Sequence, residues 1–208
     1  MGKNAGRVDC QLAYSYNGTH WNRTFRKPFI PNREQGEYGW GGVYPSSMII
    51  APDDSIRIYG SGSIYEHHQN GRAIREGIAP SKLLSYRLRK DGFIGLRTIK
   101  ERGELITKNL SIKGNTLSLN VKAPRGVVRV QVADMEGKPL PGYSYKECEP
   151  FTGDDVSWKP RWKAHLDLSG LEDRGRTRIG VRIERGELYA IRVNCFLYYG
   201  CNKPVRHF

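Results

Sequence analysis

The chain has 208 residues, which is enough for one or two domains with a buried core. Glycine (24 residues) and tyrosine (12) are frequent and methionine (3) is rare, a composition that favours short strands and turns over helices. No segment approaches the ~20 consecutive apolar residues of a membrane helix, and the first residues lack the apolar stretch of a signal peptide. We therefore expect an all-β protein that does not use a membrane as partner.

The formal net charge of +13 is spread along the chain. Residues 1–100 contain 15 Lys and Arg against 8 Asp and Glu, and residues 101–208 contain 19 against 13, so neither half is a basic tail. A positive field of this size attracts polyanions such as anionic glycans or nucleic acid. Dispersed, solvated surface charge is the more common reason for such a balance, and the sequence leaves both interpretations open. Nucleic acid is the less favoured partner, because the sequence contains no RNA-binding motif.

Residues 1–100 are predicted to form short strands joined by turns. Asn17-Gly18 and Asp91-Gly92 are predicted hairpin turns, because glycine tolerates the positive φ that such turns require. The second of these turns is expected to join two strands within Leu83–Ile99 and to mark the seam between two domains, residues 1–100 and 101–208. The other predicted strands of this half are Val8–Ser15, Val43–Ile50 and Ser55–Gly62, with a turn at Asp53-Asp54 and a polar loop over Ser63–Pro80.

Residues 101–208 show strand patterns at the regular spacing that is typical of an antiparallel β-sandwich. Apolar residues recur at every second position in Val128–Val132 and Ile179–Ile183, which predicts one buried face for each strand. Arg129, Arg178 and Arg182 fall on the opposite faces and form a candidate anion-contacting surface. The predicted strands are Glu104–Ile112, Thr116–Ala123, Val127–Asp134, Ala164–Leu168, Arg176–Glu184 and Glu187–Phe196, separated by turns at Lys113-Gly-Asn, Pro124-Arg-Gly, Glu136-Gly-Lys and Arg185-Gly.

Two stretches of the first half carry a family resemblance. Leu12–Trp21, LAYSYNGTHW, resembles the "YS-x-D-G-x-x-W" hairpin in blades of the five-bladed propeller glycosidases, the superfamily of invertase-like and arabinanase-like glycoside hydrolases, with Asn17 in place of the usual Asp. Val43–Gly62 resembles the "VYP…W-I-Y-Y-G-G" passage that closes the propeller in those proteins. The resemblance implies terminal propeller-blade strands in residues 1–100, with Trp21 packed in a blade. The catalytic carboxylates of the family lie on earlier blades, so we predict no catalytic residue in this chain.

The second half resembles the C-terminal β-sandwich appended to many bacterial proteins of that type. The matching strings are Glu136–Tyr143 (EGKPLPGY), Glu147–Pro150 (ECEP), Gly153–Asp155 (GDD) and Glu187–Tyr189 (ELY). The resemblance implies a jelly-roll-like β-sandwich and a secreted or periplasmic location. Invertase-like enzymes carry their acid/base glutamate in a Glu-Cys pair on a propeller blade, whereas Glu147-Cys148 lies inside the sandwich segment, so we do not predict catalysis there.

These features predict a non-catalytic, carbohydrate-associated module, the C-terminal portion of a glycosidase-like protein, in a structural or glycan-binding role. One alternative is part of an active glycoside hydrolase with its catalytic carboxylates outside this chain, in which case Glu66 is the first acid to test. Another alternative is a basic polyanion-binding protein. One of Trp158 and Trp162 is expected to fill the core. The candidate carbohydrate-binding residues are Trp158, Trp162, Tyr143, Tyr145, Trp40, Tyr44 and His67.

Three further features bear on cofactors and partners, namely the cysteines, an acidic cluster and the strand edges. Cys195 and Cys201 either bridge a short loop or remain free thiols, and the four cysteines lack zinc-site spacing. An acidic cluster either binds a structural Ca²⁺ or caps a turn, and no other cofactor is predicted. An incomplete propeller leaves strand edges that can pair with a second copy of the chain. The cluster comprises Glu147, Glu149, Asp154 and Asp155.

Overall fold

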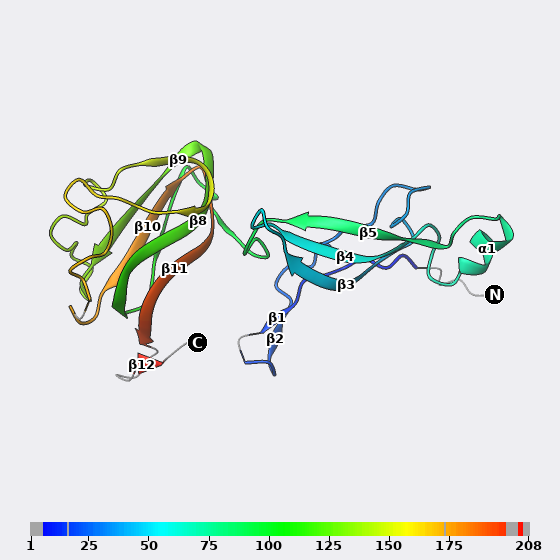
Figure 1. The fold of residues 1–208 in the computed structure, drawn as a ribbon, viewed down its shortest axis with the longest axis horizontal. Helices are drawn as coiled ribbons and strands as arrows, with labels where there is room; N and C mark the ends of the chain where they lie inside the picture. Colours follow the sequence, from blue (N-terminus) through cyan, green and yellow to red (C-terminus); the bar gives the residue numbers. More distant parts are fainter. Residues whose placement is uncertain (1–5, 16, 173, 199–203, 206–208) are drawn as a thin grey trace. The chain divides into compact units, whose positions relative to one another are not determined.

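A computed structural model describes residues 6–15, 17–172 and 174–198, together with the backbone of 204–205. The chain divides into two compact units, residues 1–93 and 94–208. The division falls two residues after Asp91, whereas the predicted domain boundary lay at residue 100. Figure 1 shows the strands of each unit. The all-β prediction is confirmed, because α1 (Asn70–Arg75) is the one helix described and the named strands pair antiparallel. No helix in the described part is long and apolar enough to cross a membrane.

Unit 1 is built around a three-stranded antiparallel sheet in the order β3-β4-β5. Its strands are β3 (Gly42–Ile50), β4 (Ile56–Ser63) and β5 (Ser81–Leu88), and a separate hairpin joins β1 (Tyr14–Ser15) to β2 (Trp21–Asn22). Asp54 and Asp91 adopt the positive φ of 59° and 51° expected of turn residues. The strand predictions for β3, β4 and β5 and the hairpin at Asn17-Gly18 are confirmed.

Three predictions for unit 1 are wrong. The strands on either side of Asp91-Gly92 do not form a hairpin, because β5 pairs with β4 and the short β6 (Leu96–Arg97) pairs with a strand of unit 2. The expected strand over Val8–Ser15 is reduced to β1 and single bridges at Val8 and Cys10. Trp21 is 65% exposed instead of packed, because its indole N–H donates to the Gly18 carbonyl within its own turn.

Unit 2 is one antiparallel sheet that curves into a nearly closed barrel-like form. Besides β6 it contains β7 (Arg102–Ile106), β8 (Leu110–Ala133), β9 (Phe151–Trp158), β10 (Arg178–Glu184), β11 (Glu187–Tyr198) and β12 (Pro204–Val205). The first half of the long β8 pairs with β11 and its second half with β10, and Figure 1 shows these three ribbons side by side. A further bridge from Leu110 to Thr177 brings the start of β8 beside the start of β10.

A shared bend shapes unit 2. β8 changes partner at 124–126, and β10 continues into β11 through Arg185-Gly186, so both long segments turn at the same place. A Cβ on Gly126 would lie 1.8 Å from the Glu184 carbonyl oxygen, and one on Gly186 would lie 2.8 Å from the Ala123 Cβ. Only glycine permits this approach, which is why Pro124-Arg-Gly bends a continuous strand instead of ending one.

The buried face of unit 2 follows the predicted alternation. The apolar residues of Val128–Val132 and Ile179–Ile183 are all buried, which confirms that pattern. The Lys113-Gly-Asn turn and the Ala164–Leu168 strand were predicted wrongly, since β8 runs through the first and the second contributes only an isolated bridge at His165. β9 was missed because Gly153-Asp-Asp has the composition of a turn. Pairing with β8 holds it as a strand, with Asp154 opposite Lys122.

Candidate functional site

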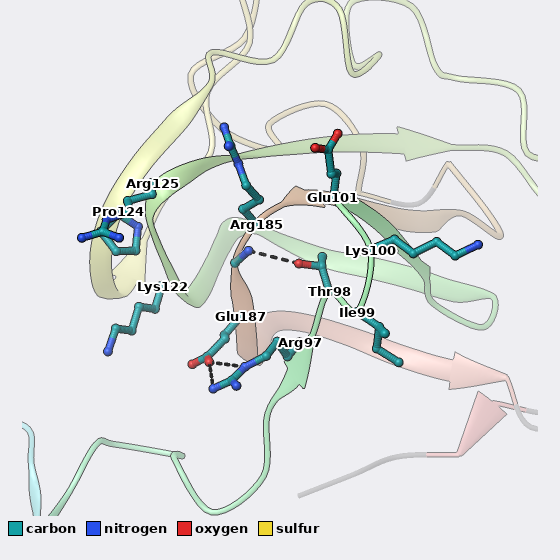
Figure 2. A pocket seen from close by; sticks show the side chains of 11 residues that line it. Arg97, Thr98, Ile99, Lys100, Glu101, Lys122, Pro124, Arg125, Arg185 and Glu187 are labelled. Carbon is teal, nitrogen blue, oxygen red and sulfur yellow. Dashed lines mark hydrogen bonds and ion pairs between the residues drawn. The ribbon is translucent and has the colours of Figure 1, made fainter.

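The bends of three chain segments meet at one corner of unit 2. Arg185 N–H donates to the Glu101 carbonyl oxygen (2.9 Å), and Thr98 N–H donates to the Gly186 carbonyl oxygen (3.2 Å). Gly186 N–H in turn donates to the Thr98 hydroxyl (3.3 Å). Together the segments surround an open hollow of about 560 Å³, which we call the corner groove (Figure 2). It is lined by Arg97, Thr98, Ile99, Lys100, Glu101, Lys122, Pro124, Arg125, Arg185, Gly186 and Glu187.

The corner groove is basic. Five of its side chains are Lys or Arg and two are Glu, an excess of three positive charges. Arg97 is neutralised by Glu187, with 2.6 Å between its Nε and the Glu187 Oε1. Of the other four basic side chains, Lys122 lies close enough to Glu187 to lower the pKa of that carboxyl group. For the other three no ion pair is found within the described residues, so their charge is available to a ligand. The four basic side chains are Lys100, Lys122, Arg125 and Arg185.

These four basic side chains are spread around the corner. Figure 2 shows Lys122 and Arg125 on one side, Lys100 on the opposite side and Arg185 between them. The side chains fan outward and do not converge on a single point. Such an arrangement suits an extended polyanion with charges repeated along its length better than one small anion.

Glu187 is the acidic anchor of the groove. The Tyr189 hydroxyl donates a hydrogen bond to this carboxylate and lowers its pKa below the usual range for glutamate. Arg97 and Lys122 lower the pKa of Glu187 further, against the opposing effect of partial burial. Glu187 is therefore ionised at neutral pH and holds Arg97 in place.

The predicted anion-contacting face is formed, but two of its three arginines, Arg178 and Arg182, are engaged by neighbouring side chains. β8 and β10 are neighbours as expected, and Arg182 lies directly opposite Arg129. Arg182 forms an ion pair with Glu104 (3.2 Å) and its guanidinium lies 4.1 Å from the centre of the Tyr145 ring. Arg178 donates from Nε to the Asn109 side-chain oxygen (2.8 Å). Arg178 and Arg182 therefore stabilise the outer face of the sheet.

Tyr145, a predicted ring-stacking residue, is covered by this arginine contact. It is 7% exposed. Burial raises the pKa of Tyr145 above its usual value, and the Glu104 carboxylate raises it further. The ring therefore belongs to the wall of the sheet and offers no free face to a sugar.

Two other predicted sugar-stacking residues are part of the core. Trp162 is 1% exposed and its indole N–H donates to the Val130 carbonyl oxygen (3.0 Å). Tyr143 is 2% exposed and its hydroxyl donates to the Asp167 carbonyl oxygen (3.1 Å). Since both rings are enclosed by protein atoms, their assignment as stacking platforms is corrected to core packing. Trp158 is half-buried and stacks on Phe151, with 4.8 Å between ring centres.

Unit 1 holds the remaining sequence candidates. Trp40 is half-buried, with the Arg7 guanidinium 5.8 Å from its ring centre. Tyr44 lies in β3 with its ring folded over Gly42. His67 is exposed in the loop before α1, and Glu66 beside it is half-buried. None of these residues lines either of two hollows of unit 1, one beside Cys10 and Met48 and one beside Tyr86 and Leu88.

The Glu147-Cys148 pair has a structural environment. Ser144 donates from its hydroxyl (2.6 Å) and its backbone N–H (3.1 Å) to the Glu147 carboxylate, and these bonds lower the pKa of Glu147. Burial raises the pKa of Cys148 to about 11, so its thiol is protonated at neutral pH. The sulfur accepts a bond from Val130 N–H (3.2 Å). The pair therefore fixes a turn against the core.

The predicted acidic turn at Asp154-Asp155 is instead part of β9. The Asp155 carboxylate accepts a bond from Ser157 N–H (2.7 Å). Among the residues that the structure describes, no three His, Cys, Asp or Glu side chains are grouped to hold a metal ion. Cys201 lies outside the described residues, and with it the choice between a Cys195–Cys201 disulfide and two free thiols.

The basic residues of the corner groove were not singled out from the sequence. Their signal was present, because Arg125 and Arg185 each stand beside the glycine of a predicted turn and Lys100 closely precedes Gly103. Each turn was recognised separately. The sequence pattern does not show that these turns lie next to one another, because their proximity depends on the pairing of β8 with β10 and β11.

Comparison of the chain with protein-family models, with curated protein sequences and with solved structures finds no match. The resemblance to propeller glycosidases therefore depends on the quoted motifs alone. The function has to be argued from the corner groove and its chemistry.

Proposed function

We propose that the protein is a non-catalytic binding module for an anionic polysaccharide, which it holds in the corner groove. The observation that carries the proposal is the set of four basic side chains, besides the paired Arg97, on three adjacent bends of one sheet. Lys and Arg at such spacing bind sulfate or carboxylate groups along a chain, and the release of counterions from the polyanion supplies much of the affinity.

The composition of the groove favours an anionic glycan over two other ligands. None of its eleven described lining residues is aromatic. Neutral sugars bind through stacking on exposed aromatic rings, and the predicted platforms Tyr143, Tyr145 and Trp162 are buried. Single-stranded nucleic acid also relies on base stacking on aromatic side chains. A glycan with regularly spaced charges needs only the cations that the groove offers.

We also propose that the two units derive from a propeller-type carbohydrate-active protein, unit 1 from terminal blade strands and unit 2 from an appended jelly-roll-like sandwich. The support is that the motif strings of unit 1 fall on the β1-β2 hairpin and on β3 and β4, and that two of the four strings of unit 2, Gly153–Asp155 and Glu187–Tyr189, fall on β9 and β11. β3, β4 and β5 form a meander, as strands within a blade do. On this view the chain works in a secreted or periplasmic setting, where polysaccharides are met.

Affinity electrophoresis tests the proposal, with gels containing heparin, polygalacturonate or neutral dextran. We expect retardation by the two anionic polymers and none by dextran. The triple variant Lys100→Gln/Lys122→Gln/Arg125→Gln should lose most of the retardation. In titrations with heparin, its plot of log affinity against log salt concentration should be shallower by about one unit for each lost contact.

A matched control separates the groove from the overall charge. Lys138→Gln/Lys146→Gln/Lys159→Gln removes the same number of charges from exposed positions of unit 2 outside the groove and should bind like the wild type. Equal weakening in both variants would mean that binding is a property of net charge. Retardation by dextran, or equally strong binding of single-stranded DNA, would contradict the assignment to an anionic glycan.

A further inference from the structure

We infer that the outer edge of β3 pairs with the β3 of a second copy of this chain. β4 is the central strand of the sheet in unit 1, so β3 and β5 each have an outer edge. The beginning of the β3 edge is covered, because Val43 N–H donates to the Val8 carbonyl oxygen (2.9 Å) and Val8 N–H donates to that of Gly41 (3.1 Å). Among the described residues, no strand pairs with the outer side of Ser47–Ile50.

The hydrogen-bond alternation shows which backbone groups face outward. At the turn between β3 and β4, Ala51 N–H donates to the Ser55 carbonyl oxygen (2.8 Å). Hydrogen-bonded pairs alternate along an antiparallel ladder, so Ile49 and its partner Arg57 form the next bonded pair. Met48 and Ile50 consequently direct their backbone N–H and C=O groups away from β4. An incoming antiparallel strand would satisfy these groups.

The side chains of this edge are apolar and exposed on both faces of the sheet. Met48 is 56% exposed, Ile49 51% and Ile50 69%. Native proteins usually protect such an edge with charges, a covering segment or a bulge. The irregularity between Pro45 and Ser47 lies before the exposed part, and the pairing of Ser47–Ile50 with β4 is regular. A second strand would bury these three side chains and bond the outward backbone groups together.

Charge identifies the partner as another copy of the chain. The stretch 41–52 contains no charged residue in a chain of net charge +13, so two copies can approach there without bringing like charges together. The opposite outer strand, β5, carries Lys82 and Arg87 and therefore resists such pairing. An uncharged apolar strand is complementary to itself in antiparallel orientation, which gives a closed two-fold dimer.

Sedimentation equilibrium of the full chain, without any polyanion, tests this pairing. The expected result is a mass that rises with concentration from 23.7 kDa for one chain toward twice that value. Met48→Lys/Ile50→Lys should remain monomeric at every concentration, because two charges then face each other across the edge. Leu83→Lys/Ser85→Lys adds the same charge to exposed positions of β5 and should dimerise like the wild type.

Two proline variants distinguish the loss of backbone pairing from an effect of the added charges. Met48→Pro removes an outward N–H from β3, and by the same alternation Ser85→Pro removes one from the outer side of β5. The first should abolish the dimer and the second should not, with circular dichroism showing that both are folded. A wild type that stays monomeric, or equal loss of the dimer in the β3 and β5 variants, would overturn the inference. Glycan binding by the corner groove is unaffected by either outcome.

Discussion

The two units differ in how much apolar surface their strands enclose. The core of unit 2 contains 18 buried residues from β8, β10, β11 and the loops that cover them, whereas that of unit 1 contains four, Ile30, Val43, Ile56 and Ile58. A sheet that curves on itself encloses one continuous core, while a three-stranded sheet with little covering it leaves apolar side chains in solvent. The difference shows why unit 2 is suited to present a rigid groove.

The proposed association surface lies in unit 1, the unit with the smaller core. Because the core of unit 1 is small, the apolar side chains at the β3 edge are not buried in it and remain exposed, where a partner can contact them. In unit 2 most apolar strand residues are already buried. We therefore expect ligand binding and self-association to be separable by mutation, and the stability of the units to differ in the same sense.

The largest expected effect is the loss of the central side chain of unit 2. Trp162→Ala removes a fully buried ring and leaves the Val130 carbonyl oxygen without its indole donor. We expect the free energy of unfolding of unit 2 to fall by about 3–5 kcal/mol, measured by urea denaturation followed by circular dichroism. Leu166→Ala, at a 75% exposed position of the same unit, should change it by less than about 0.5 kcal/mol. Similar losses in both variants would contradict the assignment of Trp162 to the core.

A smaller effect is expected from the equivalent truncation in unit 1. Ile58 is 7% exposed and belongs to the four-residue core, so Ile58→Ala should lower the stability of unit 1 by about 2 kcal/mol. Hydrogen exchange locates the effect, with faster exchange expected for amides of β4 and β5 and unchanged exchange for β8 and β10. Leu83→Ala, at a 77% exposed site, is the matched control. Equal acceleration in β8 would show that the two units unfold together.

The sequence predicted the strands whose patterns are local. β3, β4, β10 and β11 were placed to within about two residues, because alternating apolar positions are bounded there by turn residues. β8 was predicted as separate strands, since Pro124-Arg-Gly has the composition of a turn. Whether such a triplet ends a strand or bends it depends on Glu184, whose carbonyl oxygen occupies the space beside Gly126.

The candidate site was largely beyond prediction from sequence. The corner groove combines residues near positions 97, 122 and 185, which become neighbours only through strand pairing. Which aromatic residues are exposed likewise depends on strand pairing. Trp158 and Trp162 are four residues apart and of one type, yet only Trp162 reaches Val130 with its indole N–H and fills the core. Local composition therefore predicted the elements but not the surface that they present.

The smallest expected effect concerns pH and again separates the units. Glu187 in unit 2 has a pKa lowered by the Tyr189 hydroxyl and then by Arg97, and Asp53 in unit 1 has a pKa lowered by hydrogen bonds from Ser55. A carboxyl group whose pKa is lower in the folded chain than in the unfolded chain stabilises the fold above the unfolded pKa of about 4. This contribution is lost as the pH falls through the folded pKa.

Each unit should therefore lose stability between about pH 5 and pH 2. Glu187 and Asp53 should each account for part of this loss, beside the other carboxyl groups with a lowered pKa, Glu147 and Asp167 in unit 2 and Glu76 in unit 1. We expect Glu187→Gln to flatten the pH dependence of unfolding in unit 2 and leave that of unit 1 unchanged, and Asp53→Asn to do the reverse. Urea denaturation at several pH values in this range checks both expectations, with hydrogen exchange of amides in β11 reporting on unit 2 and of amides in β4 reporting on unit 1. Glu101→Gln, which removes an exposed carboxylate of the same groove, should follow the wild type. If it instead matches Glu187→Gln, the pH dependence arises from the general charge of the corner and not from the bond to Tyr189.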